Sequence, residues 1–114
     1  MKQWTRKIAS SVLPLSILAI LSKRESYGYE IRKMLVSFNL GDFKSGTVYP
    51  LLTRLEEEGL IASRWAELHD DPPRKMIQIT DTGRDALKEG VQDVEYLLSG
   101  IRNVMEGKWH EHSQ

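Results

Sequence analysis

Residues 44–61 read KSGTVYPLLTRLEEEGLI, and this stretch decides the fold. Its apolar side chains recur three, four and seven positions apart, which places them on one side of a helix: Val48, Leu51, Leu52 and Leu55. The opposite side carries side chains that hydrogen-bond to phosphates or base edges: Thr47, Tyr49, Thr53 and Arg54. Gly59 ends the helix, and a strand follows. This combination of faces is typical of the reading helix of a helix-turn-helix protein.

The start of this helix has two candidates, because Ser45 and Thr47 both have side chains that suit an N-cap. Proline is tolerated in a helix only in the first turn, so Pro50 favours the later start. Lys44 and Ser45 then precede the helix, beside free backbone N–H groups that favour phosphate.

The composition is that of a globular chain of one domain, with 114 residues, 40% hydrophobic and 28% charged. The sequence has no cysteine, which excludes disulfide scaffolds, thiolate metal sites and cysteine nucleophiles. Basic residues precede an apolar run at residues 12–21 and imitate a signal peptide. However, this run is half of the about 20 residues that a membrane span needs. We therefore expect a buried helix, no membrane association and a cytoplasmic protein.

The formal net charge is zero, but the two halves of the chain differ. Residues 1–54 hold nine Lys/Arg and three Asp/Glu, a net +6, whereas residues 55–114 hold seven and thirteen, a net −6. Such a chain can present a basic face to phosphate while its remainder stays acidic. Chance segregation on a solvated surface is the equal alternative.

The helices before the reading helix follow from periodicity and turn residues. A helix is predicted over residues 13–22, with Pro14 in its first turn. Residues 3–10 form either a short preceding helix or an arm. Ser26-Tyr27-Gly28 reads as a turn. Apolar spacing then predicts a second helix that begins at Tyr29 and ends near Asn39-Leu40-Gly41.

Two strands are predicted after the reading helix, at residues 60–68 and 75–80. Their buried members are expected to be Trp65, Ile77 and Ile79, and the residues between the strands form a polar tip broken by proline. Three helices followed by a hairpin is the order of a winged helix-turn-helix. We therefore expect a mainly α fold of the α+β class.

A long last helix is predicted from Thr80 or Asp81, either of which can cap it, to about Gly107. Its apolar residues follow alternating spacings of four and three, as in a helix that pairs with another helix: Leu87, Val91, Val94, Leu98, Ile101 and Met105. The helix is also longer than a small domain needs, so we predict a dimer interface. Packing against its own domain is the alternative, and Gly90 and Gly100 weaken the helix.

A reading helix and a dimerisation helix belong together, because two reading helices about one DNA turn apart read a palindromic site. We predict a DNA-binding domain at residues 1–80, and a dimerisation helix with its tail at residues 81–114. The candidate DNA contacts of the reading helix are Lys44, Ser45, Thr47, Tyr49, Thr53 and Arg54. The alternative is that they are ordinary surface residues of a packed helix.

Pro73-Arg74-Lys75 lies where the hairpin turns back. Two adjacent cations stiffened by proline can enter the minor groove or clamp its backbone, so Arg74 and Lys75 join the candidate DNA contacts. Solvated charge is the alternative. Acids repel phosphate, and we expect His69-Asp70-Asp71 and Glu56-Glu57-Glu58 to point away from DNA.

His110 and His112 in the terminal tail are the only residues that suggest a metal site. Two tail histidines without a further ligand are more often solvated. The sequence shows no Ser-His-acid pattern, glycine-rich phosphate loop or carboxylate pair in a credible cleft. We therefore predict no enzymatic activity, no cofactor and no metal.

Five motifs resemble the PadR-type transcriptional regulators, and they follow the order found in that family. They are YGYEI at 27–31, GTVYPLL at 46–52, RLEEEGLI at 54–61, PRK at 73–75 and TDTGR at 80–84. The single helix after the hairpin resembles the compact subfamily. The resemblance implies a winged-helix homodimer that represses its own or neighbouring genes. It also implies phosphate contact at the Tyr49 position, Arg74 and Lys75 on the wing, and pairing of the last helix across the dimer.

Some compact members bind flat aromatic drugs at the dimer interface through a central tryptophan on the last helix. Here Val94 occupies that region and Trp109 lies near the helix end, so Trp4 or Tyr96 would have to supply the aromatic wall. The expected partners are double-stranded DNA, a second copy of the chain, and a small aromatic or hydrophobic effector. The alternative function is a protein-interaction module that docks a partner through the winged helix and the last helix.

Overall fold

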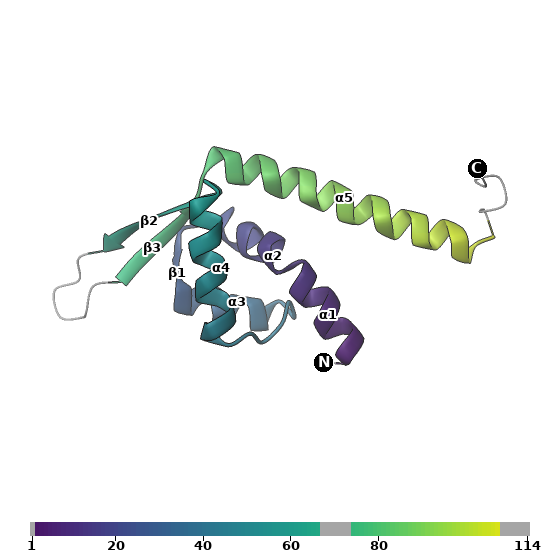
Figure 1. Cartoon of the computed structure of the whole chain (residues 1–114), viewed down its shortest axis with the longest axis horizontal. Helices are drawn as coiled ribbons and strands as arrows, with labels where there is room; N and C mark the ends of the chain where they lie inside the picture. The colour runs from purple at the N-terminus through teal and green to yellow at the C-terminus, as the bar shows by residue number, and fades with distance from the viewer. Residues whose placement is uncertain (1, 67–73, 108–114) are drawn as a thin grey trace.

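The computed structural model describes residues 2–66 and 74–107, in five helices and a three-stranded antiparallel sheet. The elements in chain order are α1 (Gln3–Ser11), α2 (Leu13–Leu21), β1 (Ser26–Tyr27), α3 (Gly28–Ser37), α4 (Ser45–Glu57), β2 (Ile61–Ala66), β3 (Arg74–Ile79) and α5 (Asp81–Met105) (Figure 1). The first helices and the sheet form a compact body, and α5 extends away from it (Figure 1). The predicted mainly α, winged helix-turn-helix fold is confirmed.

The hydrophobic core lies between α2, α3, α4 and the sheet. α2 contributes four side chains that are at most 2% exposed: Leu13, Ile17, Leu18 and Leu21. The buried helix predicted at residues 13–22 is thus confirmed, and residues 3–10 lie in a helix of their own. Within the described ranges, no single helix is long and apolar enough to cross a membrane. α1 and α2 meet that test only together, as a pair bent by 58°.

α4 begins at Ser45, so the predicted later start at Thr47 is wrong. The Lys44 carbonyl accepts hydrogen bonds from the N–H groups of Thr47 and Val48, at 2.9 and 3.1 Å. These two bonds form the first turn of the helix, so Lys44 is the N-cap residue and Thr47 already lies within the helix. Pro50 therefore lies inside the helix, where its missing N–H removes one backbone hydrogen bond.

The sheet has the strand order β1-β3-β2, and both pairs of neighbours are antiparallel. β1 contributes only two residues, and Ser26 pairs with Ile77 and Tyr27 with Met76. The sequence predicts only a turn at this position. The short strand joins the start of α3 directly to the hairpin of β2 and β3, which we call the wing.

Trp65 is 64% exposed, so the prediction that it is buried is wrong. Ile61 and Trp65 point to the same face of β2, because side chains alternate along a strand. Ile61 is buried, but Trp65 lies four residues further along, about 13 Å toward the tip and beyond the core. Ile77 and Ile79 of β3 are buried as predicted.

α5 runs along α2 before it leaves the body of the domain, and Gly90 lies at this contact. A Cβ atom at Gly90 would meet the side chain of Leu15. The glycine that weakens the isolated helix therefore allows α5 to approach α2 closely. At Gly100 a Cβ atom would find no heavy atom within 4 Å.

The Thr80 side chain caps α5 and ties it to the end of α4. Its Oγ1 accepts from the Gly83 N–H at 3.0 Å and donates to the Gly59 carbonyl at 2.6 Å. Thr80→Ala removes both bonds, so we expect it to lower the free energy of unfolding by about 1–2 kcal/mol. Urea unfolding measures the loss, and Thr82→Ala, an exposed position in the same turn, is the control. Equal stability of the two variants would contradict the capping role.

Candidate nucleic-acid interface

α4 presents one buried and one exposed face, as its sequence period predicts. The apolar residues are between 0 and 9% exposed: Val48, Leu51, Leu52 and Leu55. The polar residues predicted to contact DNA are all exposed: Thr47, Tyr49, Thr53 and Arg54. The packing of one face therefore fixes how the other is displayed.

A groove lies between α4 and the wing. Tyr49 and Thr53 line it from α4, and Arg74 and Lys75 line it from β3. The Thr53 hydroxyl donates to the Tyr49 carbonyl at 3.1 Å, which leaves its oxygen as an acceptor and its methyl group for contact with a ligand. Four residues predicted to contact DNA are thus brought together in one groove.

The remaining predicted contacts lie elsewhere on α4. Thr47 and Arg54 line a second groove, formed with residues of α1 and α2. Lys44 and Ser45 are exposed where α4 begins. The predicted contacts therefore flank the exposed edge of α4 on both sides instead of forming one patch.

Gly46 and Pro50 are exposed on this edge, and the sequence analysis did not include them among the candidate DNA contacts. They lie four positions apart, which places them one helical turn from each other. No heavy atom lies within 4 Å of a Cβ built on Gly46. Their spacing on the polar side of α4 could have placed them on its exposed edge from the sequence alone.

Aromatic rings lie beneath the two cations of β3. The Arg74 guanidinium lies over the ring of Tyr27, 5.5 Å from its centroid, and the Lys75 ammonium lies over Trp65 at 5.4 Å. These contacts stabilise the long side chains without neutralising their charge. Tyr27 and Trp65 were not among the predicted site residues, and Pro73 lies outside the described residues.

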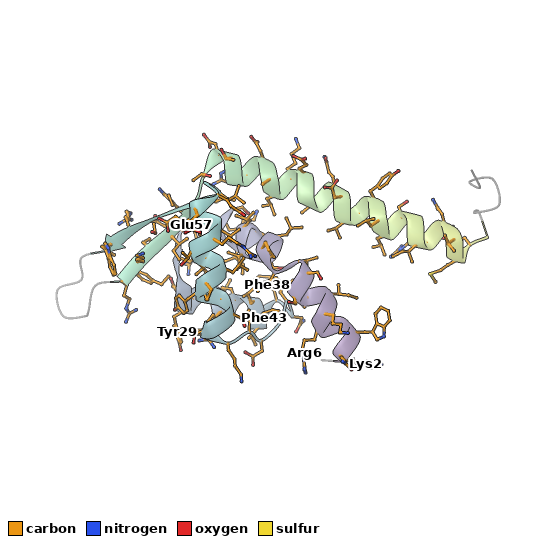
Figure 2. The ribbon with its side chains drawn as sticks, in the orientation of Figure 1. Lys2, Arg6, Tyr29, Phe38, Phe43 and Glu57 are labelled. Atoms are coloured by element: carbon orange, nitrogen blue, oxygen red, sulfur yellow. The ribbon has the colours of Figure 1, made fainter. Side chains whose placement is uncertain are left out.

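The acidic end of α4 contacts the sheet. The Ser63 hydroxyl donates to the two carboxylate oxygens of Glu56, at 2.9 and 3.1 Å. Glu57 and Glu58 are exposed, and Figure 2 shows Glu57 at the end of α4 that is nearest to α5. Glu56 also lines the groove beside Tyr49 and Arg74. That these acids turn away from DNA stays a prediction, and residues 69–71 lie outside the described ranges.

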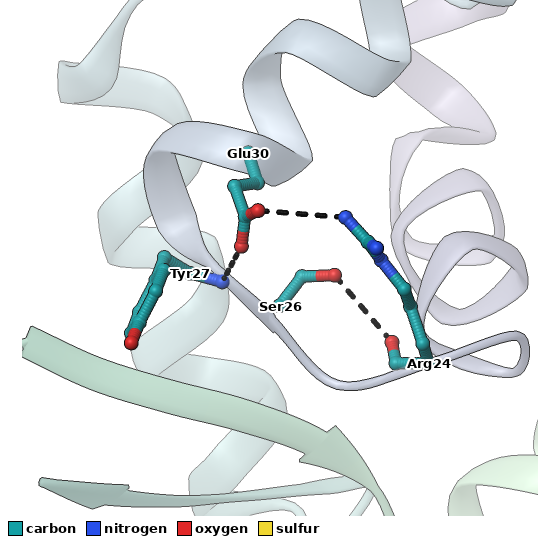
Figure 3. A network of polar contacts seen from close by, with 4 residues as sticks. All are labelled: Arg24, Ser26, Tyr27 and Glu30. Atoms are coloured by element: carbon teal, nitrogen blue, oxygen red, sulfur yellow. Dashed lines mark hydrogen bonds and ion pairs between the residues drawn. The ribbon is translucent and has the colours of Figure 1, made fainter. Parts of the chain in front are cut away.

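Polar contacts fix the start and the middle of α3. At its start the Glu30 carboxylate accepts from the Tyr27 N–H at 2.9 Å and pairs with Arg24 at 3.4 Å (Figure 3). From the middle of the helix, Arg32 Nε donates to the Phe43 carbonyl at 3.1 Å, in the turn that leads to α4. The contact between Arg32 and Phe43 thereby ties α3 to the turn that leads into α4.

Most of the predicted dimer seam is free of contact with its own domain. Leu87 packs against the core, but the other five members are 40–79% exposed: Val91, Val94, Leu98, Ile101 and Met105. Every described residue from 91 onward is exposed except Asn103, which is half-buried. The alternative of simple packing within the domain therefore applies only to the first turns of α5.

The candidate effector residues do not share a site within one chain. Trp4 on α1 is 80% exposed and Tyr96 on α5 is 81% exposed. Tyr96 follows Val94 by two positions, or about 200° around the helix, so these two point to opposite sides. Within residues 2–66 and 74–107, no group of three or more His, Asp or Glu residues could hold a metal ion. Trp109, His110 and His112 lie outside the described residues.

Comparison with known proteins places these features in one family. Residues 17–89 match the family model described as the transcriptional regulator PadR-like family. The chain is 34% identical over 92 residues to the transcriptional regulator YqjI of Escherichia coli, covering 79% of this chain and 42% of that protein. It is 35% identical over 81 residues to the negative transcriptional regulator PadR of Bacillus subtilis, covering 68% and 44%. The chain thus spans less than half the length of these two relatives.

Solved structures share the fold over most of the chain. A PadR-like transcriptional regulator from Bacillus cereus superposes with a TM-score of 0.76 at 32% identity, covering 87% of this chain and 96% of that one. The Bacillus subtilis PadR structure in complex with operator DNA superposes with a TM-score of 0.65 at 30% identity, covering 70% and 46%. The family consists of transcriptional regulators, not enzymes, as the sequence predicts. The groove between α4 and the wing is thus part of a transcriptional regulator, and the chain belongs to the PadR-like family.

Proposed function

We propose that this chain is a homodimeric repressor that binds a palindromic operator in cytoplasmic double-stranded DNA. One observation carries the proposal: a single groove brings Tyr49 and Thr53 of α4 together with Arg74 and Lys75 of the wing. Hydroxyl groups and cations that converge beside an exposed helix form a surface suited to phosphates. The complex of the Bacillus subtilis relative with operator DNA supports the same use.

The dimensions of α4 fit this role. An α-helix with its side chains is about 10–12 Å wide, and the major groove of DNA is about 12 Å wide. In our proposal the exposed edge of α4 enters the major groove and the wing follows the adjacent backbone. Tyr49 and Arg74 then contact phosphate on one side of α4, and Arg54 reaches toward the other side.

The exposed apolar side chains of α5 support a second copy as its partner. The helix is about 37 Å long, and its outer part contacts little of its own chain. Leu97 and Val104 are 67% and 56% exposed and flank the seam, so the apolar face is wider than a two-helix seam requires. Trp4 and Ile8 on α1 are also exposed, one turn apart. We propose that the partner's α5 covers the seam, and that the partner's α1 covers the apolar residues beside the seam.

Repression and release by an effector complete the proposal. The relative from Bacillus subtilis is described as a negative regulator, which supports repression here. Trp4, with Ile8 and Lys7, lines a surface pocket on α1. In a dimer, this pocket would lie next to the α5 seam and could take a small aromatic or hydrophobic effector.

Arg74→Ala tests the DNA contact. We expect it to weaken binding to the upstream DNA of its own operon about tenfold, because it removes a charge-assisted bond to phosphate. The slope of log affinity against log salt should fall by about one. Fluorescence anisotropy titration at several salt concentrations measures both, with Lys88→Ala on α5 as the control for lost charge.

Two outcomes would contradict the proposal. Binding without sequence preference, or without steep weakening by salt, would exclude a specific operator. A folded dimer that binds no DNA, and whose properties do not change in Arg74→Ala, would favour the alternative of a protein-interaction module.

A further inference from the structure

Tyr27 and Gly28 contact both elements that face DNA in the proposed complex. They lie where β1 ends and α3 begins. Gly28 lies against the ring of Tyr49 on α4, and the ring of Tyr27 lies against Arg74 on the wing. Both contacts lie in the groove between α4 and the wing.

Gly28 provides the surface on which the Tyr49 ring rests. A Cβ atom at Gly28 would lie 2.6 Å from Tyr49 Cε1, 2.9 Å from its hydroxyl oxygen and 3.0 Å from Cζ. Cβ atoms do not approach ring carbons this closely, so any larger residue would force the ring to move. Tyr49 itself is 45% exposed, so a Cβ atom at Gly28 would push its ring outward from the position it occupies against the glycine. Gly28 therefore sets where the Tyr49 hydroxyl lies.

Tyr27 acts on the wing in a comparable way. The Arg74 guanidinium lies 5.5 Å from the centroid of the Tyr27 ring, within the range of a cation–π contact. Arg74 is the first residue of β3 and is exposed, so this ring is the contact that orients its side chain within the described structure. The contact leaves the positive charge available for phosphate.

The backbone of the two residues is itself held in place. The Tyr27 N–H donates to the Glu30 carboxylate at 2.9 Å, and Figure 3 shows this contact beside the Arg24–Glu30 pair. Tyr27 also pairs with Met76 of β3. The backbone that carries the Tyr27–Arg74 and Gly28–Tyr49 contacts is therefore fixed by these hydrogen bonds.

We propose that Tyr27 and Gly28 are positioning residues that fix the distance between the Tyr49 hydroxyl and the Arg74 guanidinium. This inference rests on the proposed function. With both groups held at one spacing, they contact neighbouring phosphates together, and neither loses much side-chain freedom on binding. The two residues then control operator affinity without touching DNA themselves.

A double-mutant cycle tests the action of Gly28 through Tyr49. Gly28→Ala should weaken operator binding about tenfold, close to the effect of Tyr49→Ala. In the Tyr49→Ala background the added methyl group has room, so Gly28→Ala should then have no further effect on operator affinity. Additive effects in the double variant would overturn the role of Gly28.

The salt dependence of binding tests the action of Tyr27 through Arg74. Tyr27→Leu should reduce the slope of log affinity against log salt by close to one, as Arg74→Ala does, whereas Tyr27→Phe keeps the ring and should leave the slope unchanged. A loss of stability alone would not change this slope. An unchanged slope in Tyr27→Leu would overturn the role of Tyr27.

The same measurements separate this inference from the proposed function. If Tyr49→Ala and Arg74→Ala both leave operator binding unchanged, the proposed DNA contacts themselves are wrong. If both variants weaken binding, but Gly28→Ala and Tyr27→Leu do not, the DNA contacts stand and only the positioning role fails.

Discussion

Gly83→Ala should lower the free energy of unfolding by about 3 kcal/mol, a large loss for one methyl group. Gly83 is buried in the first turn of α5, and a Cβ atom there would overlap the carbonyl oxygen of Leu60. The same Cβ would lie 2.8 Å from Ile79 Cγ1. Its nearest neighbour is a backbone atom, so a change of rotamer cannot relieve the overlap.

The surroundings of the Leu60 carbonyl make this overlap costly. The oxygen accepts the Thr80 N–H at 3.1 Å, and Thr80 in turn donates to the Gly59 carbonyl at 2.6 Å. The end of α4, the start of β2, the end of β3 and the start of α5 therefore meet at one point (Figure 1). Moving α5 outward to admit the methyl group would break the Thr80 bonds as well, so the loss exceeds that of the cap alone.

Gly100→Ala is a matched control on the same helix. A Cβ atom at Gly100 meets nothing within 4 Å, and alanine is the better helix former, so this variant should gain up to about 1 kcal/mol. Thermal or urea unfolding of both variants at one protein concentration gives the comparison. If Gly83→Ala were as stable as the wild type, the close approach of α5 to Leu60 would be wrong.

The helices were predictable because their signals are local and repeated. The period of α4, the apolar run of α2 and the long seam of α5 each extend over several turns. β1 was not predictable, since a strand of two residues shows no alternation and depends entirely on pairing with β3. The start of α4 was mispredicted because the sequence shows capping side chains but not which backbone carbonyl accepts the first helical hydrogen bonds. Here the Lys44 carbonyl accepts them, although the Lys44 side chain makes no capping bond.

The polar residues of the candidate DNA interface could be named from the sequence, but the contacts that hold them in place could not. Exposed hydroxyl groups and cations on α4 and the wing are visible in the sequence. Their partners are visible only when the register of the sheet is known, because Trp65 faces Lys75 across β2 and β3. Trp65 was predicted to be buried because a strand pattern does not show where the core ends. The contact of Gly28 with Tyr49 likewise depends on how α3 packs on α4.

Val94→Asp should disrupt the proposed dimer without unfolding the chain. Val94 lies in the middle of the α5 seam and is 40% exposed in the single chain, so the aspartate costs little there. In the dimer each copy would bury an unpaired carboxylate against the partner helix, at a cost of about 3–5 kcal/mol. The dissociation constant of the dimer should therefore rise by at least about 100-fold.

Tyr96→Asp is the control that distinguishes disruption of the seam from a general weakening of helix α5. Tyr96 is 81% exposed and points to the opposite side of α5, so the same residue introduced there changes helix propensity but not the seam. Sedimentation velocity over a range of concentrations should show Val94→Asp as a monomer and Tyr96→Asp as a dimer. Operator affinity should fall only in Val94→Asp, because a palindrome holds two linked reading helices far more tightly than one. If Val94→Asp stayed a dimer, the two copies would have to associate through another surface.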